Sequence, residues 1–332
     1  MLQYVPYLRP RWSITIAPFF DDEYLSALYE GRLRLRSVVA GFLRRIGTCL
    51  RMKRFELAWV EAELLPWIPW AVERVLADRV SLALDYDDAV FHRYDAAGSP
   101  VVRALLGGKV ARLMRRAGVV IAGNRYIASY AEQAGARHVE IVPTVLDTAR
   151  YRIAPAPRSP QLTIGWIGTP KTQHYLQTIE GALHHAHRAL DARIVAIGAH
   201  GTPLRHTPVE VRAWDERTEA AELAAIDVGI MPLIDSPWER GKCGYKLLQY
   251  MASGKPVVAS PVGANRDIVE HGRNGYLASS IEEWIHAFQL LQADRERASA
   301  MGHAGREKVE RDYSLVAVAP RVHGILDKAS AG

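Results

Sequence analysis

A short basic segment between residues 238 and 263 carries the residue types that bind phosphate groups. Gly244 and Lys246 stand at the start of a helical pattern, and Arg240 and Lys242 lie in the loop before it. The first peptide N–H groups of a helix have no partner inside the helix, and the helix dipole adds partial positive charge at that end. An anion is therefore favoured at this helix start.

A second loop with phosphate-binding residue types follows a predicted buried strand. It contains Gly168, Thr169 and Lys171, and His174 lies beside it, where it can approach a phosphate or a leaving-group oxygen. Both loops follow strands or begin helices, so we predict that they face one ligand and, with Tyr245, form a cradle for a diphosphate. The plainer alternative is that each glycine marks an ordinary turn and each lysine is a solvated charge.

Two common nucleotide signatures are missing. Neither half of the chain has Gly-x-Gly-x-x-Gly after its first predicted strand with an acid further on, so we expect no nicotinamide or flavin cofactor. The Gly-Lys pairs at 108–109, 241–242 and 254–255 lack the earlier glycine of a Walker A loop.

Acidic residues gather after two predicted strands of the first half. They are Glu61, Glu63, Asp85, Asp87 and Asp88. Asp-x-Asp fits a magnesium or manganese site, and it also fits caps or turns before a helix. We favour hydrogen bonds to sugar hydroxyls, or stabilisation of an oxocarbenium-like centre, because the lysines already meet the diphosphate charge and make a metal unnecessary.

Alternating strand and helix patterns predict an α/β protein with two domains, each with a parallel sheet. The first series of expected strands is 13–17, 57–60, 80–84, 119–122 and 139–142. The second is 162–168, 193–198, 209–213, 228–231, 257–260 and 276–278. We read the proline-rich stretch 153–160 as a linker. Ser280 and Glu283 form a capping box at a helix start, and the last helix is expected from 314 to about 328.

Composition places the chain among ordinary globular proteins. It has 332 residues, of which 49% are hydrophobic and 23% charged, so disordered and fibrous classes are excluded. No apolar run long enough to span a membrane and no secretory signal are visible, so we expect a cytoplasmic protein. Cys49 and Cys243 are the only cysteines and suggest neither a disulfide framework nor a zinc site.

Residues 31–55 carry basic but no acidic side chains, interleaved with apolar ones. This pattern predicts a basic amphipathic helix, within a modest net charge of +6. One interpretation is peripheral attachment to an anionic membrane surface, on its inner face. The other is a surface helix whose apolar stripe belongs to the core. We expect no nucleic-acid partner.

Residues 246–263 and 268–277 closely resemble the donor-site signature of the retaining glycosyltransferases of family 4, whose two-domain fold is called GT-B. Supporting similarities lie at residues 141–147, 165–168 and 227–232. The resemblance covers almost the whole chain. It implies two doubly wound Rossmann-like domains that face each other across a cleft.

The resemblance also implies a division of labour. Residues 160–313 would bind a nucleotide diphosphate sugar, and residues 1–152 an acceptor, with a last helix at 314–330 packing back on the first domain. It implies transfer with retention, without a metal, to a glycan or lipid-linked acceptor in polysaccharide or glycolipid biosynthesis. Together with the residues above, this assigns to the donor Gly168, Lys171, His174, Arg240, Lys242, Gly244, Tyr245, Lys246 and Gln249. Asp87, Asp88 and Lys246 are the expected catalytic residues, and Glu61, Glu63 and Asp85 the expected acceptor side.

The donor motif departs from the family in one respect. Many members carry a pair of glutamates, of which the second contacts ribose and the first the sugar hydroxyls, and the matching positions here hold Gln249 and Gly241. Gln249 can still bond a ribose hydroxyl, although a plain polar role fits equally, and sugar contact would need Glu239 or other residues. The sequence at 243–250 resembles a subgroup that places a lysine against the phosphates, which supports Lys246.

The N-terminus departs as well, because family members open with a buried strand and a glycine-rich loop, and this sequence begins inside that pattern. We expect this first strand to be missing. An active glycosyltransferase is the first hypothesis, and a catalytically impaired nucleotide-sugar-binding protein of the same fold is the alternative. A sugar-nucleotide epimerase on the same fold is a weaker third.

Overall fold

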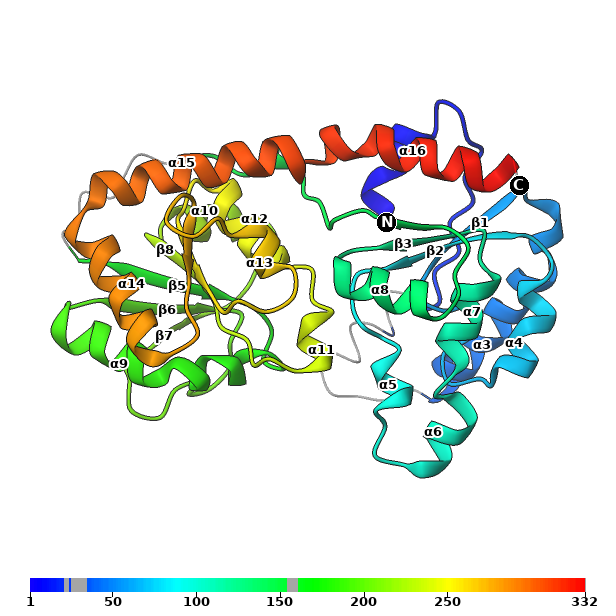
Figure 1. The fold of residues 1–332 in the computed structure, drawn as a ribbon, viewed down its shortest axis with the longest axis horizontal. Coiled ribbons are helices and arrows are strands. Elements are labelled where there is room, and N and C mark those ends of the chain that lie inside the picture. Colours follow the sequence, from blue (N-terminus) through cyan, green and yellow to red (C-terminus); the bar gives the residue numbers. More distant parts are fainter. Residues whose placement is uncertain (21–23, 25–34, 154–160, 332) are drawn as a thin grey trace. The chain divides into compact units, whose positions relative to one another are not determined.

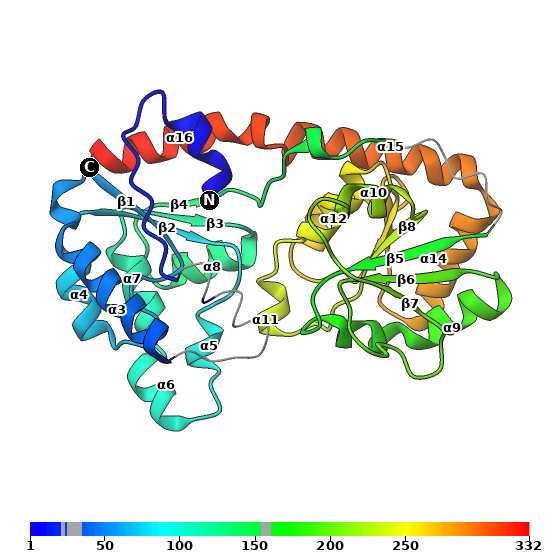
Figure 2. The same cartoon turned by 180° about the vertical axis from the view of Figure 1, so that it is seen from behind.

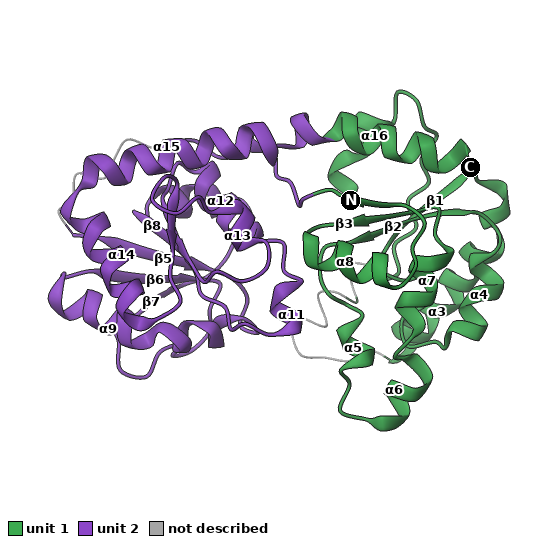
Figure 3. Ribbon diagram, viewed as in Figure 1, with its two compact units in different colours: residues 1–142, 319–332 green, residues 143–318 purple. Residues whose placement is uncertain are grey.

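The computed structural model describes residues 1–20, 24, 35–153 and 161–331. The chain divides into two compact units, shown in Figure 3. Unit 1 comprises residues 1–142 and 319–332, and unit 2 comprises residues 143–318. The last helix, α16 (Leu315–Ala331), therefore begins in unit 2 and ends in unit 1. The predicted linker at 153–160 lies outside the described residues except for its first position.

Unit 1 is built on a parallel sheet with the strand order β1-β2-β3-β4. Its strands are β1 (Leu57–Glu61), β2 (Ser81–Tyr86), β3 (Val119–Ala122) and β4 (Val139–Ile141). Its helices are η1 (Leu2–Tyr4), α1 (Val5–Leu8), α3 (Leu35–Leu50), η2 (Met52–Arg54), α4 (Trp70–Ala77), α5 (His92–Asp95), α6 (Pro100–Leu106), α7 (Lys109–Arg116) and α8 (Arg125–Gln133) (Figure 1). These four strands confirm four of the five predicted for the first half.

The fifth predicted strand, 13–17, is wrong. Ser13–Ala17 makes no sheet pairing in the described structure, and Ile16 is half exposed. Pro10 and Pro18 flank the run. Since proline cannot donate to a sheet ladder, this segment is a poor strand despite its alternating apolar residues.

Unit 2 is a doubly wound α/β unit whose six parallel strands follow the order β10-β9-β8-β5-β6-β7. The strands are β5 (Thr163–Ile167), β6 (Arg193–Ile197), β7 (Glu210–Arg212), β8 (Val228–Met231), β9 (Val257–Ala259) and β10 (Gly275–Leu277). The helices are η3 (Thr148–Arg150), η4 (Gln173–Ile179), α9 (Glu180–Ala189), α10 (Glu219–Ala224), α11 (Pro237–Arg240), α12 (Tyr245–Ala252), α13 (Asn265–Ile268), α14 (Ile281–Ala293) and α15 (Arg295–Asp312). All six predicted strands are confirmed.

Apolar helix faces cover both sides of this sheet. Residues of α9 and α14 pack against one face, and residues of α10 and α12 against the other (Figures 1 and 2). The predicted capping box at the start of α14 is present, because the Ser280 hydroxyl accepts from the Glu283 N–H and the Glu283 carboxylate accepts from the Ser280 N–H. Burial on both faces explains why the strands read as continuous apolar runs.

Among the described residues, none of the helices is long and apolar enough to cross a membrane.

Candidate functional site

The strand order of unit 2 reverses between β5 and β8, which is where Rossmann-like sheets bind ligands. These two strands pair only at Ile164–Val228 and Gly165–Gly229. Beyond that point the Tyr250 hydroxyl of α12 stands between them. It accepts the Ile167 N–H at 2.8 Å and donates to the Ile230 carbonyl at 3.2 Å. The strands therefore separate at their carboxyl ends without leaving these backbone groups unpaired.

The two loops predicted to share one ligand meet beside this switch point. Lys246, in the first turn of α12, places its Nζ 3.5 Å from the Thr172 hydroxyl of the loop after β5. The same ammonium lies 4.4 Å from the centre of the Trp166 ring, which partly compensates its charge. Sequence reasoning missed Thr172 and Trp166, because neither carries the charge or the backbone freedom that singled out their neighbours.

Gly168 brings the β5 loop close to Lys246. A Cβ atom at this position would lie 2.5 Å from the Trp166 ring and 2.7 Å from Lys246 Nζ. The Gly168 N–H donates to the Ile197 carbonyl at 3.0 Å, which fixes the loop to the end of β6. Only glycine fits here with Lys246 in its present position.

Gly244 sets the start of α12. It adopts a left-handed conformation with φ of 70°, and a Cβ atom there would collide with the side chain of Ile268. Its carbonyl accepts the Leu247 N–H at 2.9 Å, so the helix begins immediately after it. A residue other than glycine would be strained in this conformation and would also clash. At the other end of the helix, Gly254 is left-handed as well, with φ of 70°.

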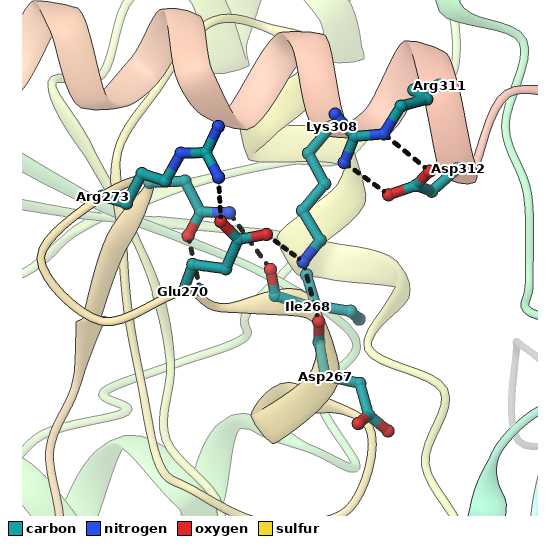
Figure 4. A network of polar contacts seen from close by, with 8 residues as sticks. Asp267, Ile268, Glu270, Arg273, Lys308, Arg311 and Asp312 are labelled. Carbon is teal, nitrogen blue, oxygen red and sulfur yellow. Dashed lines mark hydrogen bonds and ion pairs between the residues drawn. The ribbon is translucent and has the colours of Figure 1, made fainter.

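Polar contacts hold the turn that supports Gly244. The Glu270 carboxylate binds Lys308 of α15 at 2.6 Å and Arg273 at 2.8 Å, and Lys308 also donates to the Asp267 carbonyl at 2.9 Å (Figure 4). Asn274 closes the same turn by donating to the Ile268 carbonyl at 3.1 Å. This network keeps α13 against the start of α12.

Burial, together with the charge of nearby Lys242, lowers the pKa of Lys246 to about 7. The side chain is nevertheless partly exposed, so a ligand can reach it. Within the part of the chain that the structure describes, no carboxylate forms an ion pair with Lys246. A protonated Lys246 therefore lacks an anionic counterpart in the fold, and an anion placed beside it would raise its pKa.

The other predicted basic residues have local partners or lie exposed on unit 2. Arg240 pairs with Asp235 at 2.6 Å and is exposed, as is Lys171. His174 Nδ1 donates to the Lys171 carbonyl at 2.8 Å, so these neighbours hold one another. Tyr245 is also exposed.

Glu239 links α11 to η4 through hydrogen bonds that sequence reasoning did not predict. It is buried, and its carboxylate accepts hydrogen bonds from the Tyr175 hydroxyl of η4 and from the Ser236 hydroxyl. In this structure its carboxylate therefore ties α11 to η4. A signal was present, since Ser236 and Glu239 have capping-box spacing with Pro237 at the first helical position.

Gln249 is buried rather than open to solvent. Its amide nitrogen lies 3.5 Å from the Tyr151 hydroxyl, which donates to Glu219 at 2.7 Å. Trp214 donates to the other oxygen of Glu219 at 2.7 Å. For a ribose hydroxyl to contact the Gln249 side chain, the hydrogen bonds among Gln249, Tyr151 and Glu219 would have to change.

The acids of unit 1 split into two groups. Glu61 and Asp85 are register partners at the carboxyl ends of β1 and β2, and Asp87 follows immediately. Burial is the main cause that raises the pKa of Asp85 to about 7, and the negative charges of Asp87 and Glu61 act in the same direction. Asp88 is partly buried and is not the cap of α5, whose first residue is His92.

Glu63 belongs instead to a buried ion cluster. Its carboxylate binds Lys109 Nζ at 2.6 Å and accepts from the Tyr94 hydroxyl at 2.8 Å. Lys109 also lies 3.3 Å from Glu73, and all three ionised side chains are almost fully buried. Glu63 is therefore enclosed, unlike Glu61, which is exposed.

Most of unit 2 is similar in sequence to a known protein family. Residues 161–294 match the model of a family described as glycosyl transferases group 1. A GDP-mannose-dependent alpha-(1-6)-phosphatidylinositol monomannoside mannosyltransferase of Mycobacterium tuberculosis is 26% identical over 155 residues, which cover 46% of this chain and 36% of that protein. The alpha-maltose-1-phosphate synthase of Mycolicibacterium smegmatis is 33% identical over 117 residues, or 33% of this chain and 29% of that enzyme. The matches thus span about a third of these relatives.

Solved structures resemble the chain over most of its length. Sucrose-phosphate synthase from Thermosynechococcus elongatus has a TM-score of 0.69 at 16% identity, covering 90% of this chain and 79% of that one. Anabaena HepE in complex with UDP has a TM-score of 0.67 at 16% identity, covering 86% and 82%. Unit 2 therefore resembles glycosyl transferases group 1 in sequence, and the chain has the GT-B fold with two Rossmann-like domains.

Proposed function

We propose that the chain is a glycosyltransferase with a nucleotide diphosphate sugar as its donor. One observation carries the proposal: Lys246 holds a half-buried ammonium without a carboxylate partner among the described residues, at a helix start beside the sheet's switch point. A diphosphate supplies the missing negative charge, and the first N–H groups of α12 add hydrogen-bond donors. Gly168 lets the loop after β5 lie directly against Trp166 and Lys246, which brings Thr172 to the same ammonium.

The printed names of the relatives support this donor class. The mycobacterial relative is named as GDP-mannose-dependent, and HepE was solved with UDP and with UDP-glucose. These proteins differ in the base, so we propose the shared diphosphate sugar and leave the base to the experiment below.

Lys246 would act on the leaving group. When the bond between the sugar carbon and the phosphate oxygen breaks, negative charge develops on the diphosphate, and a nearby ammonium stabilises it. We propose that Lys246, supported by Lys171 and Lys242, replaces the metal ion that many phosphate enzymes use. We also propose retention of configuration, in line with the family resemblance.

The acceptor side is proposed to lie on unit 1, with a glycan or lipid-linked acceptor of cell-surface polysaccharide or glycolipid biosynthesis. Glu61, Asp85, Asp87 and Asp88 are the candidates for contacting sugar hydroxyls or stabilising positive charge on the sugar. We propose that Glu63 acts through structure only, because Lys109 and Tyr94 occupy its carboxylate.

The test is a transfer assay with UDP- and GDP-sugars and a panel of glycan and lipid-linked acceptors, in which released nucleoside diphosphate and glycosylated product are both measured. We expect product with at least one donor, undiminished by a metal chelator. Lys246→Ala should lower turnover by about a hundredfold or more while the fold stays intact.

Lys328→Ala, which removes an exposed lysine from α16, is the matched control and should keep wild-type turnover. Wild-type turnover in Lys246→Ala would reject the site. Binding of donor without transfer to any acceptor would favour an impaired binding protein, and release of an epimerised sugar without acceptor would favour an epimerase.

A further inference from the structure

Helix α3 of unit 1 carries an exposed apolar stripe. Five of its residues, spaced three or four apart, have side chains that are exposed by 37% to 75%: Leu35, Val39, Leu43, Ile46 and Leu50. Such spacing places side chains on one face of a helix. The stripe therefore faces solvent along the whole of α3 and is not part of the core, which corrects one of the two interpretations of this helix.

A face of α3 that adjoins the stripe is the one that packs. Gly41 and Cys49 are buried, and the Phe42 ring lies 5.0 Å from the ring of Phe19. Arg44 donates to the Phe19 carbonyl at 3.2 Å, and the Arg45 guanidinium lies 5.2 Å from the Phe19 ring centre. The helix is thus anchored to unit 1 through one face while its apolar stripe remains uncovered in this structure. It lies next to α4 in both views of the molecule (Figures 1 and 2).

Positive charge lies on the same helix as the stripe and in the turn after it. The exposed basic residues of α3 and the turn after it are Arg36, Arg44, Arg51, Lys53 and Arg54. The sequence from 31 to 55 contains no acidic residue. An exposed apolar stripe on a helix whose described charged residues, from 35 to 55, are all cations is complementary to a surface that is anionic outside and apolar beneath it.

We propose that α3 docks unit 1 on anionic membranes. The helix lies along the bilayer surface, with Leu35, Val39 and Leu43 among the side chains that enter the acyl region, while Arg36 and Lys53 contact lipid phosphates. This inference does not depend on the proposed transferase activity, because the surface and the donor site lie in different units.

Sedimentation with vesicles tests the proposal on the full chain. We expect binding to vesicles containing phosphatidylglycerol, weaker binding at high salt, and little binding to phosphatidylcholine alone. The double variant Val39→Glu/Leu43→Glu should bind at least about tenfold more weakly than the wild type, because two apolar side chains are lost from the bilayer. The triple variant Arg36→Gln/Lys53→Gln/Arg54→Gln should lose about fivefold per charge.

Val101→Glu/Leu105→Glu on α6 is the matched control, since these two residues are also exposed and four positions apart in unit 1. It should bind vesicles like the wild type. Equal binding by the α3 double variant would overturn the proposal. A loss of thermal stability in that variant would also overturn it, because it would show that the stripe packs inside the protein. An oligomer seen by light scattering for the wild type and dissociated in the variant would overturn it too, because it would assign the stripe to contact with a second copy.

Discussion

Lys109 in unit 1 and Lys246 in unit 2 both lie at least partly inside the protein, but the groups that surround their ammonium charges differ. Lys109 Nζ lies 2.6 Å from Glu63 and 3.3 Å from Glu73, two buried carboxylates. Lys246 Nζ faces the Trp166 ring and the Thr172 hydroxyl, and burial lowers its pKa to about 7. The fold supplies carboxylates to the first ammonium, whereas none of the described residues supplies one to the second.

This difference separates stability from function. Removing one partner of a buried ion pair leaves the other charge uncompensated, which is costly to the fold. Removing an ammonium that lacks an ion pair relieves a desolvation cost and takes away a binding group. The same substitution at the two lysines should therefore have opposite consequences.

The largest effect is expected for Lys109→Met. It leaves Glu73 buried without its cation and Glu63 with only Arg93, at 3.9 Å, so the free energy of unfolding should fall by about 3–5 kcal/mol. Denaturant unfolding of the full chain, followed by a probe in unit 1, measures this loss. A loss below about 1 kcal/mol would contradict the structural role of the cluster.

A double variant sharpens this result. Burial raises the pKa of Glu73, so its ionised carboxylate is disfavoured at this position, and the positive charge of Lys109 opposes that shift. Lys109→Met/Glu73→Gln should recover part of the stability lost in Lys109→Met, because one buried carboxylate is removed with the cation. No recovery would mean that packing, not charge, dominates.

Gly168→Ala should weaken the donor site next. The added methyl group would meet the Trp166 ring and Lys246 Nζ, so the ammonium must move and the ring must shift. We expect nucleoside diphosphate binding to weaken at least about tenfold, with a stability loss of about 1–3 kcal/mol. Calorimetric titration and thermal unfolding measure the two effects. Gly201→Ala is the control, because nothing lies near its position and only its backbone conformation is strained. Unchanged affinity in Gly168→Ala would remove Gly168 from the site.

The pH dependence of binding should be smaller and gradual. The pKa of Lys246 is lowered to about 7, so in the free protein the ammonium loses its proton as pH rises through 7. A diphosphate binds the protonated form, and its dissociation constant should rise by up to about tenfold per pH unit above 7. Titrations across this range measure the slope. In Lys246→Met the slope should vanish, and a slope that persists there would assign the titration to another group.

Much of the fold was predictable because it rests on local pattern. Buried strands read as apolar runs, and Gly244 and Gly254 bracket α12 as start and stop signals. The strand predicted at 13–17 was wrong because strand propensity does not by itself provide a neighbouring strand. The contacts that make the site are long-range: Tyr250 meets Ile167 across 83 positions, and no local rule places a hydroxyl between two strands.

Because long-range contacts are not visible in local sequence, the sequence could not tell which acids and lysines are structural. Glu63 and Asp85 look alike in sequence, yet a partner 46 positions away encloses Glu63. Lys109 follows a glycine like Lys242 and Lys255 do, and only tertiary contacts show that it is a structural cation. Sequence reasoning singled out the segment around Lys246, whereas the contacts of Thr172, Trp166 and Glu239 are visible only in the structure.

The most direct test is calorimetric titration of UDP and of GDP into wild type and Lys246→Met at a pH below 7, with unfolding measured on the same samples. We predict that at least one nucleotide binds the wild type and that the variant binds it about 10- to 150-fold more weakly. The free energy of unfolding of the variant should equal or exceed that of the wild type. Equal affinity in both proteins, or a stability loss in Lys246→Met as large as that in Lys109→Met, would contradict the claim that Lys246 awaits a diphosphate.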